Sequence, residues 1–168
     1  THYQAIAAST SLPVLLYTNP GRTQVRLSLE TVLELAEVDK ITGIKDSAGI
    51  LADTRELLAR RPEGFAVLMG RDTLILDALL AGADGAIAST ANVAPELVAG
   101  IYDAYAAGDL DLAQRAMADV HLDRGIGRRA ERGGVRIVPE VGEVPSQAQQ
   151  QRRRLGRGHT QHAGQLHA

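Results

Sequence analysis

"ITGIKDSAGILADTRELLARR", residues 41–61, joins a strand signal to a helix signal through a short polar turn. Residues 41–45 form a short apolar run of the length that strands have, and Asp-Ser-Ala-Gly follows as the turn. Residues 50–61 then place Leu51, Leu57 and Leu58 on one side of an amphipathic helix. The stretch therefore predicts one β-strand followed by one α-helix.

The same strand–helix unit occurs three more times in the first 120 residues. Apolar runs of strand length occupy 13–18, 65–70 and 85–89, and runs with helical spacing follow at 28–38, 71–82 and 94–108. The rest is expected to form a helix end at 1–12, a turn at 19–23 and a last helix at 110–120. The expected helix signals are N-caps at Ser28 and Asp72, an end at Gly82 and a first-turn proline at Pro95.

Apolar strands that alternate with amphipathic helices are typical of an α/β fold, in which helices cover a parallel sheet. Two architectures fit this pattern: a doubly wound open sheet and a (β/α)8 barrel. Four units make only half of a barrel, which typically needs about 250 residues. Because the chain also begins inside a helical pattern, we expect it to be a piece of a longer fold.

Charge divides the chain into two regions of different composition. Residues 1–120 carry 9 Lys or Arg and 16 Asp or Glu, whereas residues 121–168 carry 9 Arg and 4 Asp or Glu. We expect a partial barrel over 1–120. The Arg-, Gln-, Gly- and His-rich tail at 121–168 is expected to be disordered or non-natively packed, as after a shift of reading frame. A solvated tail is favoured over nucleic-acid binding, because the tail has no aromatic side chains.

Composition also excludes some classes of protein and site. The chain has no cysteine, which excludes disulfides and thiolate metal sites. No apolar run approaches the roughly 18 residues of a membrane span, and the first 12 residues lack the basic region of a signal peptide. We therefore expect a cytoplasmic protein, or part of one, that does not act at a membrane.

Candidate functional residues follow the strands, because the carboxyl ends of parallel strands carry the sites of α/β folds. At these ends lie Tyr17, Lys45, Gly70 and, just after Ile87, the pair Ser89 and Thr90. Lys45 is one of only two lysines in a chain that otherwise uses arginine. A lysine desolvated at a strand end has a lowered pKa and can attack a carbonyl to form a Schiff base, which arginine cannot do. A solvent-reaching structural lysine is an equally good interpretation of the position alone.

Tyr17 and Arg22 favour the chemical interpretation of Lys45. Neighbouring parallel strands lie about 4.8 Å apart, so a phenol at the end of one strand can transfer protons to an adduct on the next. Arg22 follows in the turn Asn19-Pro20-Gly21, which can direct its guanidinium back towards the site to bind a carboxylate. Taken singly, Tyr17 is more often a core residue and Arg22 a surface residue.

Four motifs in this order resemble the dihydrodipicolinate synthase / N-acetylneuraminate lyase family: "YTNPGRT" (17–23), "GIKDSAG" (43–49), "GRD" (70–72) and "GADGAIASTANVAPEL" (82–97). The resemblance implies strands 5–8 of a (β/α)8 barrel and a class I aldolase-like lyase acting on pyruvate or a related 2-oxo acid. It implies that Lys45 forms the Schiff base, Tyr17 relays protons, Arg22 binds the second substrate's carboxylate and the Ile87 backbone lines the pyruvate pocket. It implies no metal or organic cofactor, an aldehyde as second substrate, and a homo-oligomer, often a tetramer.

The resemblance leaves the exact activity open. "GRT" favours 4-hydroxy-tetrahydrodipicolinate synthesis in lysine biosynthesis, whereas "GIKDS" is also usual in sugar-acid aldolases and dehydratases of the family. Thr18 stands where the family usually has asparagine. The family's Thr-Thr or Ser-Thr carboxylate loop and its second relay tyrosine are missing from the chain. A non-catalytic fragment that assembles or aggregates through exposed sheet edges is therefore the alternative.

Overall fold

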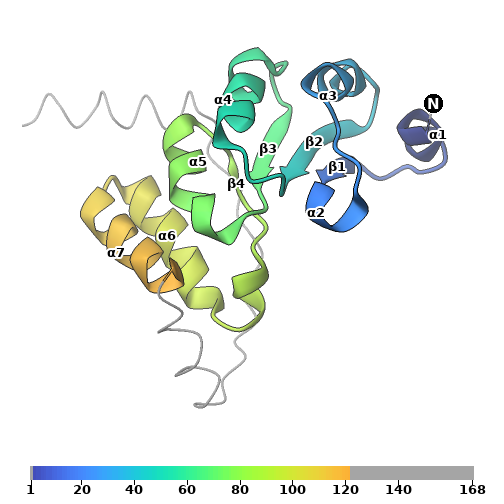
Figure 1. The fold of residues 1–168 in the computed structure, drawn as a ribbon. Helices are drawn as coiled ribbons and strands as arrows, with labels where there is room; N and C mark the ends of the chain where they lie inside the picture. The colour runs from blue at the N-terminus through green and yellow to red at the C-terminus, as the bar shows by residue number, and fades with distance from the viewer. Residues whose placement is uncertain (1, 122–168) are drawn as a thin grey trace, which may run out of the picture. The chain divides into compact units, whose positions relative to one another are not determined.

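The structure, a computed structural model, describes residues 2–121. Its sheet has four parallel strands in the order β1-β2-β3-β4 (Figure 1). Their bounds are β1 Val14–Thr18, β2 Ile41–Asp46, β3 Ala66–Met69 and β4 Gly85–Ala86. The predicted parallel α/β sheet is confirmed. Because each strand pairs with the next one along the chain, right-handed crossovers place the connecting helices on one face, as in a barrel and unlike a doubly wound sheet.

Helices connect and follow the strands (Figure 1). The α-helices are α1 His2–Ala8, α2 Pro20–Thr23, α3 Leu29–Ala36, α4 Leu51–Arg60, α5 Ile75–Ala81, α6 Pro95–Ala107 and α7 Leu110–His121. Two 3-10 turns, η1 Asp72–Leu74 and η2 Ser89–Asn92, follow β3 and β4. None of the helices within the described residues is long and apolar enough to cross a membrane.

Helix boundaries agree with the sequence where the signal is local. The Ser28 hydroxyl caps α3 by accepting a hydrogen bond from the Thr31 N–H at 3.2 Å. Gly82 ends α5 and Gly108 ends α6, both in the left-handed conformation that glycine adopts without strain. These caps explain why α3 begins, and α5 and α6 end, at the predicted places.

Three local predictions are wrong. The turn expected at 19–23 contains the short helix α2, because Pro20 at its first position is preorganised for helical backbone angles. The strand expected at 85–89 ends after Ala86, since η2 begins at Ser89. Asp72 does not cap α5; its carboxylate binds the residues after β4 instead.

The two faces of the sheet have opposite environments. Leu16, Ile44 and Val67 are register neighbours across three strands, and none is more than 1% exposed. They pack with α1, α3 and α4 in one hydrophobic cluster. One residue along, Tyr17 pairs with Lys45 on the opposite face, and Tyr17 is 44% exposed. The period of two in a strand therefore separates the core from the residues predicted to react.

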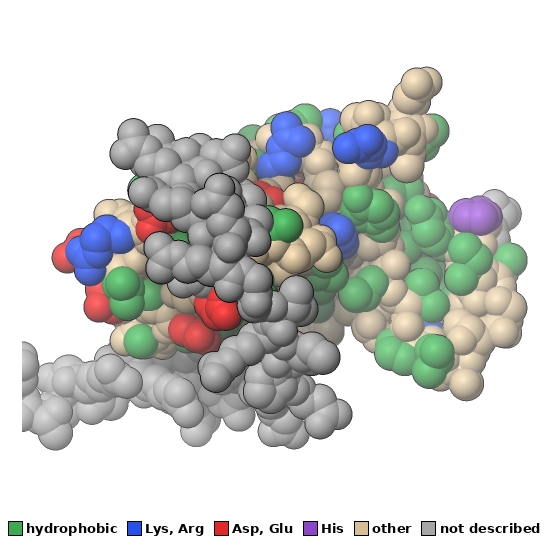
Figure 2. All heavy atoms as spheres, turned by 90° about the horizontal axis from the view of Figure 1, so that it is seen from below, with side chains coloured by type: hydrophobic (Ala, Val, Ile, Leu, Met, Phe, Trp, Pro, Cys, Tyr) green, Lys and Arg blue, Asp and Glu red, His purple; other side chains and the backbone are tan. Residues whose placement is uncertain are grey.

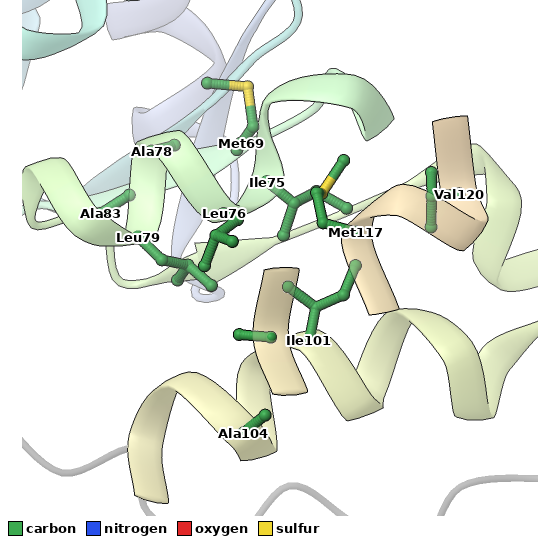
Figure 3. Close-up of a cluster of buried hydrophobic side chains, with 11 residues drawn as sticks. Met69, Ile75, Leu76, Ala78, Leu79, Ala83, Ile101, Ala104, Met117 and Val120 are labelled. Atoms are coloured by element: carbon green, nitrogen blue, oxygen red, sulfur yellow. The ribbon is translucent and has the colours of Figure 1, made fainter. Parts of the chain in front are cut away.

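A second hydrophobic cluster packs β3 and α5 against α6 and α7 (Figure 3). Its largest buried side chains include Met69, Ile75, Leu79 and Ile101, and Met117 closes it from α7. Figure 2 shows that hydrophobic side chains also remain on the surface of the described part. In the N-terminal part these exposed side chains are Ile6, Leu12, Leu15, Tyr17 and Val25.

The predicted tail at 121–168 lies almost entirely outside the described residues, and the expected disorder and frame shift stay predictions. The division of the chain into a partial barrel at 1–120 and a tail at 121–168 also stays a prediction.

Candidate active site

Lys45 and Tyr17 lie side by side at the ends of adjacent strands. They are direct register partners in the β1–β2 pair. The Lys45 Nζ lies over the Tyr17 ring, 4.8 Å from the ring centroid. A cation over an aromatic face is attracted by the negative face of the ring. The Tyr17 and Lys45 side chains therefore lie together, as expected from the sequence.

Asn19 sets the environment of the Tyr17 hydroxyl. Its Nδ2 donates a hydrogen bond to Tyr17 Oη at 2.6 Å. This hydrogen bond is the main reason why the pKa of the Tyr17 phenol is lowered from its ordinary value, and it outweighs the opposing effect of desolvation. The Ser47 hydroxyl and the positive charges of Lys45 and Arg22 lower the pKa further. Tyr17 is therefore a better acid here than a tyrosine in water.

Arg22 is placed by the short helix α2. The Asn19 carbonyl accepts hydrogen bonds from the N–H groups of Arg22 at 2.9 Å and Thr23 at 3.0 Å. Asn19 therefore fixes the start of the helical turn with its backbone while its side chain binds Tyr17. Local sequence alone did not identify Asn19, because its role depends on where the preceding strand places the phenol.

A buried carboxylate next to Lys45 anchors the end of β2. Asp46 is 5% exposed, and its side chain accepts hydrogen bonds from the Ala48 N–H at 2.9 Å and the Thr54 hydroxyl at 2.8 Å. Its carbonyl also accepts a hydrogen bond from the Gly70 N–H at 2.7 Å. These contacts tie β2 to α4 and to the end of β3. Asp46 and Thr54 thus hold the backbone that carries Lys45.

Gly70 leaves the space in which the Lys45 side chain lies. A Cβ at this position would stand 2.0 Å from Ser47 Oγ and 3.0 Å from Lys45 Cε. Both distances are shorter than a normal van der Waals contact, so either side chain would have to move. A side chain at position 70 would therefore displace Ser47 or Lys45, although the backbone angles of Gly70 are ordinary.

Asp72 connects the loop after β3 to the loop after β4. Its carboxylate accepts hydrogen bonds from the N–H of Ser89 at 3.0 Å, the Ser89 hydroxyl at 2.8 Å and the N–H of Thr90 at 2.8 Å, and it also binds the Thr90 hydroxyl. Burial raises the pKa of Asp72, but these hydrogen bonds outweigh burial and the net pKa is lowered. Asp72 is therefore held as a carboxylate that fixes Ser89 at the pocket.

These side chains surround a pocket of about 590 Å³. Its lining comprises Tyr17, Asn19, Arg22, Lys45, Ser47, Gly70, Arg71, Asp72, Thr73 and Ser89. Three of the four predicted site residues are thus brought together. The fourth, Ile87, is not among the lining residues; its side chain is 40% exposed, and its N–H donates to the Met69 carbonyl at 2.9 Å. Its expected role in substrate binding stays a prediction.

Comparison with known sequences identifies the family to which this site corresponds. Residues 1–123 match the profile of the Dihydrodipicolinate synthetase family. A 4-hydroxy-tetrahydrodipicolinate synthase from Neisseria gonorrhoeae is 43% identical over 113 residues, which cover 67% of this chain and 39% of that protein. One from Nitrosomonas europaea is 46% identical over 125 residues, which cover 73% of this chain and 43% of that protein. The chain thus spans about two fifths of the length of these curated relatives.

Solved structures show the same correspondence. The chloride-inhibited dihydrodipicolinate synthase from Acinetobacter baumannii, complexed with pyruvate, is 37% identical with a TM-score of 0.68, covering 73% of this chain and 43% of that one. The dihydrodipicolinate synthase from Aquifex aeolicus is 32% identical with a TM-score of 0.68, covering 71% and 41%. The four described strands therefore correspond to part of the TIM barrel of these enzymes.

Proposed function

Because this chain belongs to the Dihydrodipicolinate synthetase family, we propose that Lys45 forms a Schiff base with pyruvate or a related 2-oxo acid. The observation that carries the proposal is the placement of the Lys45 Nζ over the Tyr17 ring at the mouth of a pocket. An amine that attacks a carbonyl needs a nearby group to move protons, and the Tyr17 phenol lies beside Lys45. By similarity to the relatives, the proposed activity is 4-hydroxy-tetrahydrodipicolinate synthesis.

The proposed reaction begins at the ketone carbon of the 2-oxo acid. The neutral amine of Lys45 forms a bond to this carbon, and the oxygen takes up a proton to give a carbinolamine. A second proton on that oxygen lets it leave as water, which forms the iminium. Loss of a proton from the adjacent carbon then gives an enamine, which attacks the carbonyl carbon of an aldehyde. Hydrolysis of the resulting imine restores Lys45.

Tyr17 is the proposed proton carrier in these steps. A lowered pKa makes its phenol readier to donate a proton to the carbinolamine oxygen. The phenolate that results is stabilised by the Asn19 amide at 2.6 Å and can then remove the proton that produces the enamine. Arg22 is proposed to bind the carboxylate of the second substrate, because guanidinium groups bind carboxylates with two parallel hydrogen bonds.

Borohydride trapping tests the Schiff base. The chain is incubated with pyruvate and reduced, and the modified residue is identified by mass analysis of peptides, which separates lysine adducts from an adduct on the N-terminal amine. We expect the adduct on Lys45 and its loss in Lys45→Arg, which keeps the positive charge but cannot form an imine. Lys40→Arg is the matched control, because Lys40 is the only other lysine. No adduct on Lys45 in folded protein would contradict the proposal.

We also propose that the chain works as part of a homo-oligomer in the cytoplasm. Leu15 and Tyr17, on the sheet face that carries Lys45, are each 44% exposed, and β1 is an edge strand. Exposed apolar side chains and an unpaired strand edge both favour association. Light scattering after size exclusion tests the association: a monomer at every protein concentration would contradict it.

A further inference from the structure

The four-stranded sheet is open along both of its edges. β1 and β4 are the outer strands and lie at opposite edges of the sheet (Figure 1), and within residues 2–121 each pairs with one strand only. The N–H of Asp84 donates to the Val67 carbonyl at 3.0 Å, and the N–H of Ile87 donates to the Met69 carbonyl at 2.9 Å. These hydrogen bonds extend the pairing of β4 with β3 beyond its two residues. Both outer strands therefore present an edge to which another strand can pair.

The sheet face that carries Lys45 is apolar at several positions. Leu15 is 44% exposed and Ile87 is 40% exposed, and Ala66 and Leu68 on β3 are half-buried. Register and the period of two place all four on the face opposite the cluster that packs with α1, α3 and α4. An exposed apolar face of this kind marks a surface at which another protein surface can bind.

A closed barrel of eight parallel strands removes both edges and packs its interior with side chains from this face. The described residues supply four such strands, and these match part of solved TIM barrels. The strands that complete the barrel must run in the same direction, with one outer strand beside β1 and the other beside β4. A second copy of the chain meets these conditions when a two-fold axis along the barrel relates the copies, because β4 of each copy then lies beside β1 of the other.

Pairing of two copies through β1 alone is the competing arrangement. It would set the two β1 strands antiparallel and leave both β4 edges, with Ile87, exposed. Barrel closure covers both edges and both apolar faces, so it removes more apolar surface from water. Closure also brings Lys45 and Arg22 of both copies to the same end of the barrel, where like charges repel. These cations line an open pocket, where salt screens charges over about 8 Å.

We propose that two copies of this chain associate as two half-barrels, with β1 of each copy parallel to β4 of the other. The proposal names the contact of the homo-oligomer proposed above and rests on that association. The loop after β4 of one copy then lies beside Tyr17 of the other, so that both copies bound each pocket. Because the cations of the two copies repel, the dimer dissociates on dilution. Leu15 is exposed in the dilute monomer and contributes little to the stability of a single chain.

Nuclear Overhauser effects between copies test which strands meet. One preparation of the unchanged chain is deuterated except at its amides, the other is protonated, and the two are mixed in equal amounts at high concentration. Only contacts between a deuterated and a protonated copy are recorded. We expect amides of β1, residues 14–18, to contact side chains of residues 84–88 of the other copy. Contacts between β1 and β1, or an association in which β1 and β4 do not meet, would overturn the proposal.

Leu15→Arg tests whether the apolar face takes part in the contact. A guanidinium buried without a partner is unfavourable, so the dissociation constant of the dimer should rise at least about tenfold in sedimentation equilibrium. Leu80→Arg is the matched control, because Leu80 is 50% exposed and lies on α5, which packs with Met69 on the opposite face. It should change the constant by less than about twofold. Circular dichroism of the dilute variants checks their folding, and equal changes in the two would overturn the proposal.

The half-barrel dimer, the association and the Schiff base fail separately. A monomer at every protein concentration would overturn the half-barrel dimer together with the association. Association without contacts between β1 and β4 would overturn the half-barrel dimer alone. Trapping of pyruvate on Lys45 is measured independently of both, because Lys45 and Tyr17 belong to the same copy.

Discussion

Leu15 and Leu16 are neighbours in β1, yet one faces the open side of the sheet and the other lies in the core. Leu15 is 44% exposed and Leu16 is fully buried. The same alternation places Ile44 under the helices and Lys45 on the open face. One face of the sheet thus provides stability, and the other carries the residues proposed to react. Because the two sets alternate along the same strands, the rigid core fixes the position of each reactive side chain.

The largest expected effect is a loss of stability when a side chain is shortened on the sheet face that the helices cover. Leu16→Ala should lower the free energy of unfolding by about 2–5 kcal/mol, since it leaves a cavity in a packed core. Leu15→Ala removes the same atoms from the open face and should cost less than about 1 kcal/mol. Urea unfolding of both variants measures the difference. Equal losses would show that the open face is covered in solution.

A smaller loss is expected at the buried anchor below Lys45. Thr54→Val keeps the shape of the side chain but removes the hydroxyl that donates to Asp46 at 2.8 Å. Leaving that buried carboxylate with one partner fewer should cost about 1–3 kcal/mol of unfolding free energy. Thr42→Val, at an exposed position of β2, is the control and should change stability little. A Thr54→Val variant as stable as the control would contradict the anchoring role.

A substitution at Gly70 tests the open face of the sheet through the rate of adduct formation instead of through stability. Gly70→Ala should slow borohydride-trapped adduct formation about tenfold, because a new Cβ displaces the Ser47 hydroxyl and the Lys45 stem. Unfolding by urea should change by less than about 1 kcal/mol, since both neighbours are side chains that can rotate. Removing the Ser47 hydroxyl as well, in Gly70→Ala with Ser47→Ala, should recover part of the rate. An unchanged trapping rate in Gly70→Ala would contradict this reading.

The smallest expected effect is a change in the pKa of Tyr17. The Asn19 hydrogen bond favours the phenolate, so the pKa of Tyr17 is lowered, whereas burial raises the pKa of Tyr102. With rising pH, Tyr17 should therefore ionise before Tyr102. Asn19→Ala should raise the pKa of Tyr17 towards its ordinary value and leave Tyr102 unchanged. Tyrosinate absorbance in single Tyr→Phe backgrounds assigns each titration, and an unchanged pKa of Tyr17 would exclude the Asn19 effect.

The sequence predicted the elements and the pairing of Tyr17 with Lys45 because both depend on local pattern. Each residue ends an apolar run, and consecutive parallel strands with helical connections are usually neighbours. The same logic brought Arg22 to the site, since it follows Tyr17 by a short turn. The hydrophobic period and the positions of the strand ends were therefore sufficient to predict the α/β fold and to bring Tyr17, Lys45 and Arg22 to one site.

The contacts of the remaining site residues could not be predicted, because these contacts join residues that are far apart in the sequence. Asp72 looked like a helix cap, but its partners are Ser89 and Thr90 on the next strand's loop. Gly70 was expected at the end of a strand, but the space that it leaves for the Lys45 and Ser47 side chains could not be predicted. The space for the Arg71 side chain likewise comes from the absence of a side chain at Gly49.

Site-resolved trapping is the most direct test of the central claim, that the open face carries the reactive lysine. The unchanged chain is reduced with borohydride in the presence of pyruvate, and the adduct is quantified on the peptides of Lys45 and Lys40. Lys40 Nζ donates hydrogen bonds to the carbonyls of Thr10 at 2.9 Å and Ala7 at 3.4 Å, away from the pocket. We predict that nearly all of the lysine adduct lies on Lys45. Similar occupancy of the two lysines, or no adduct on either, would contradict the claim.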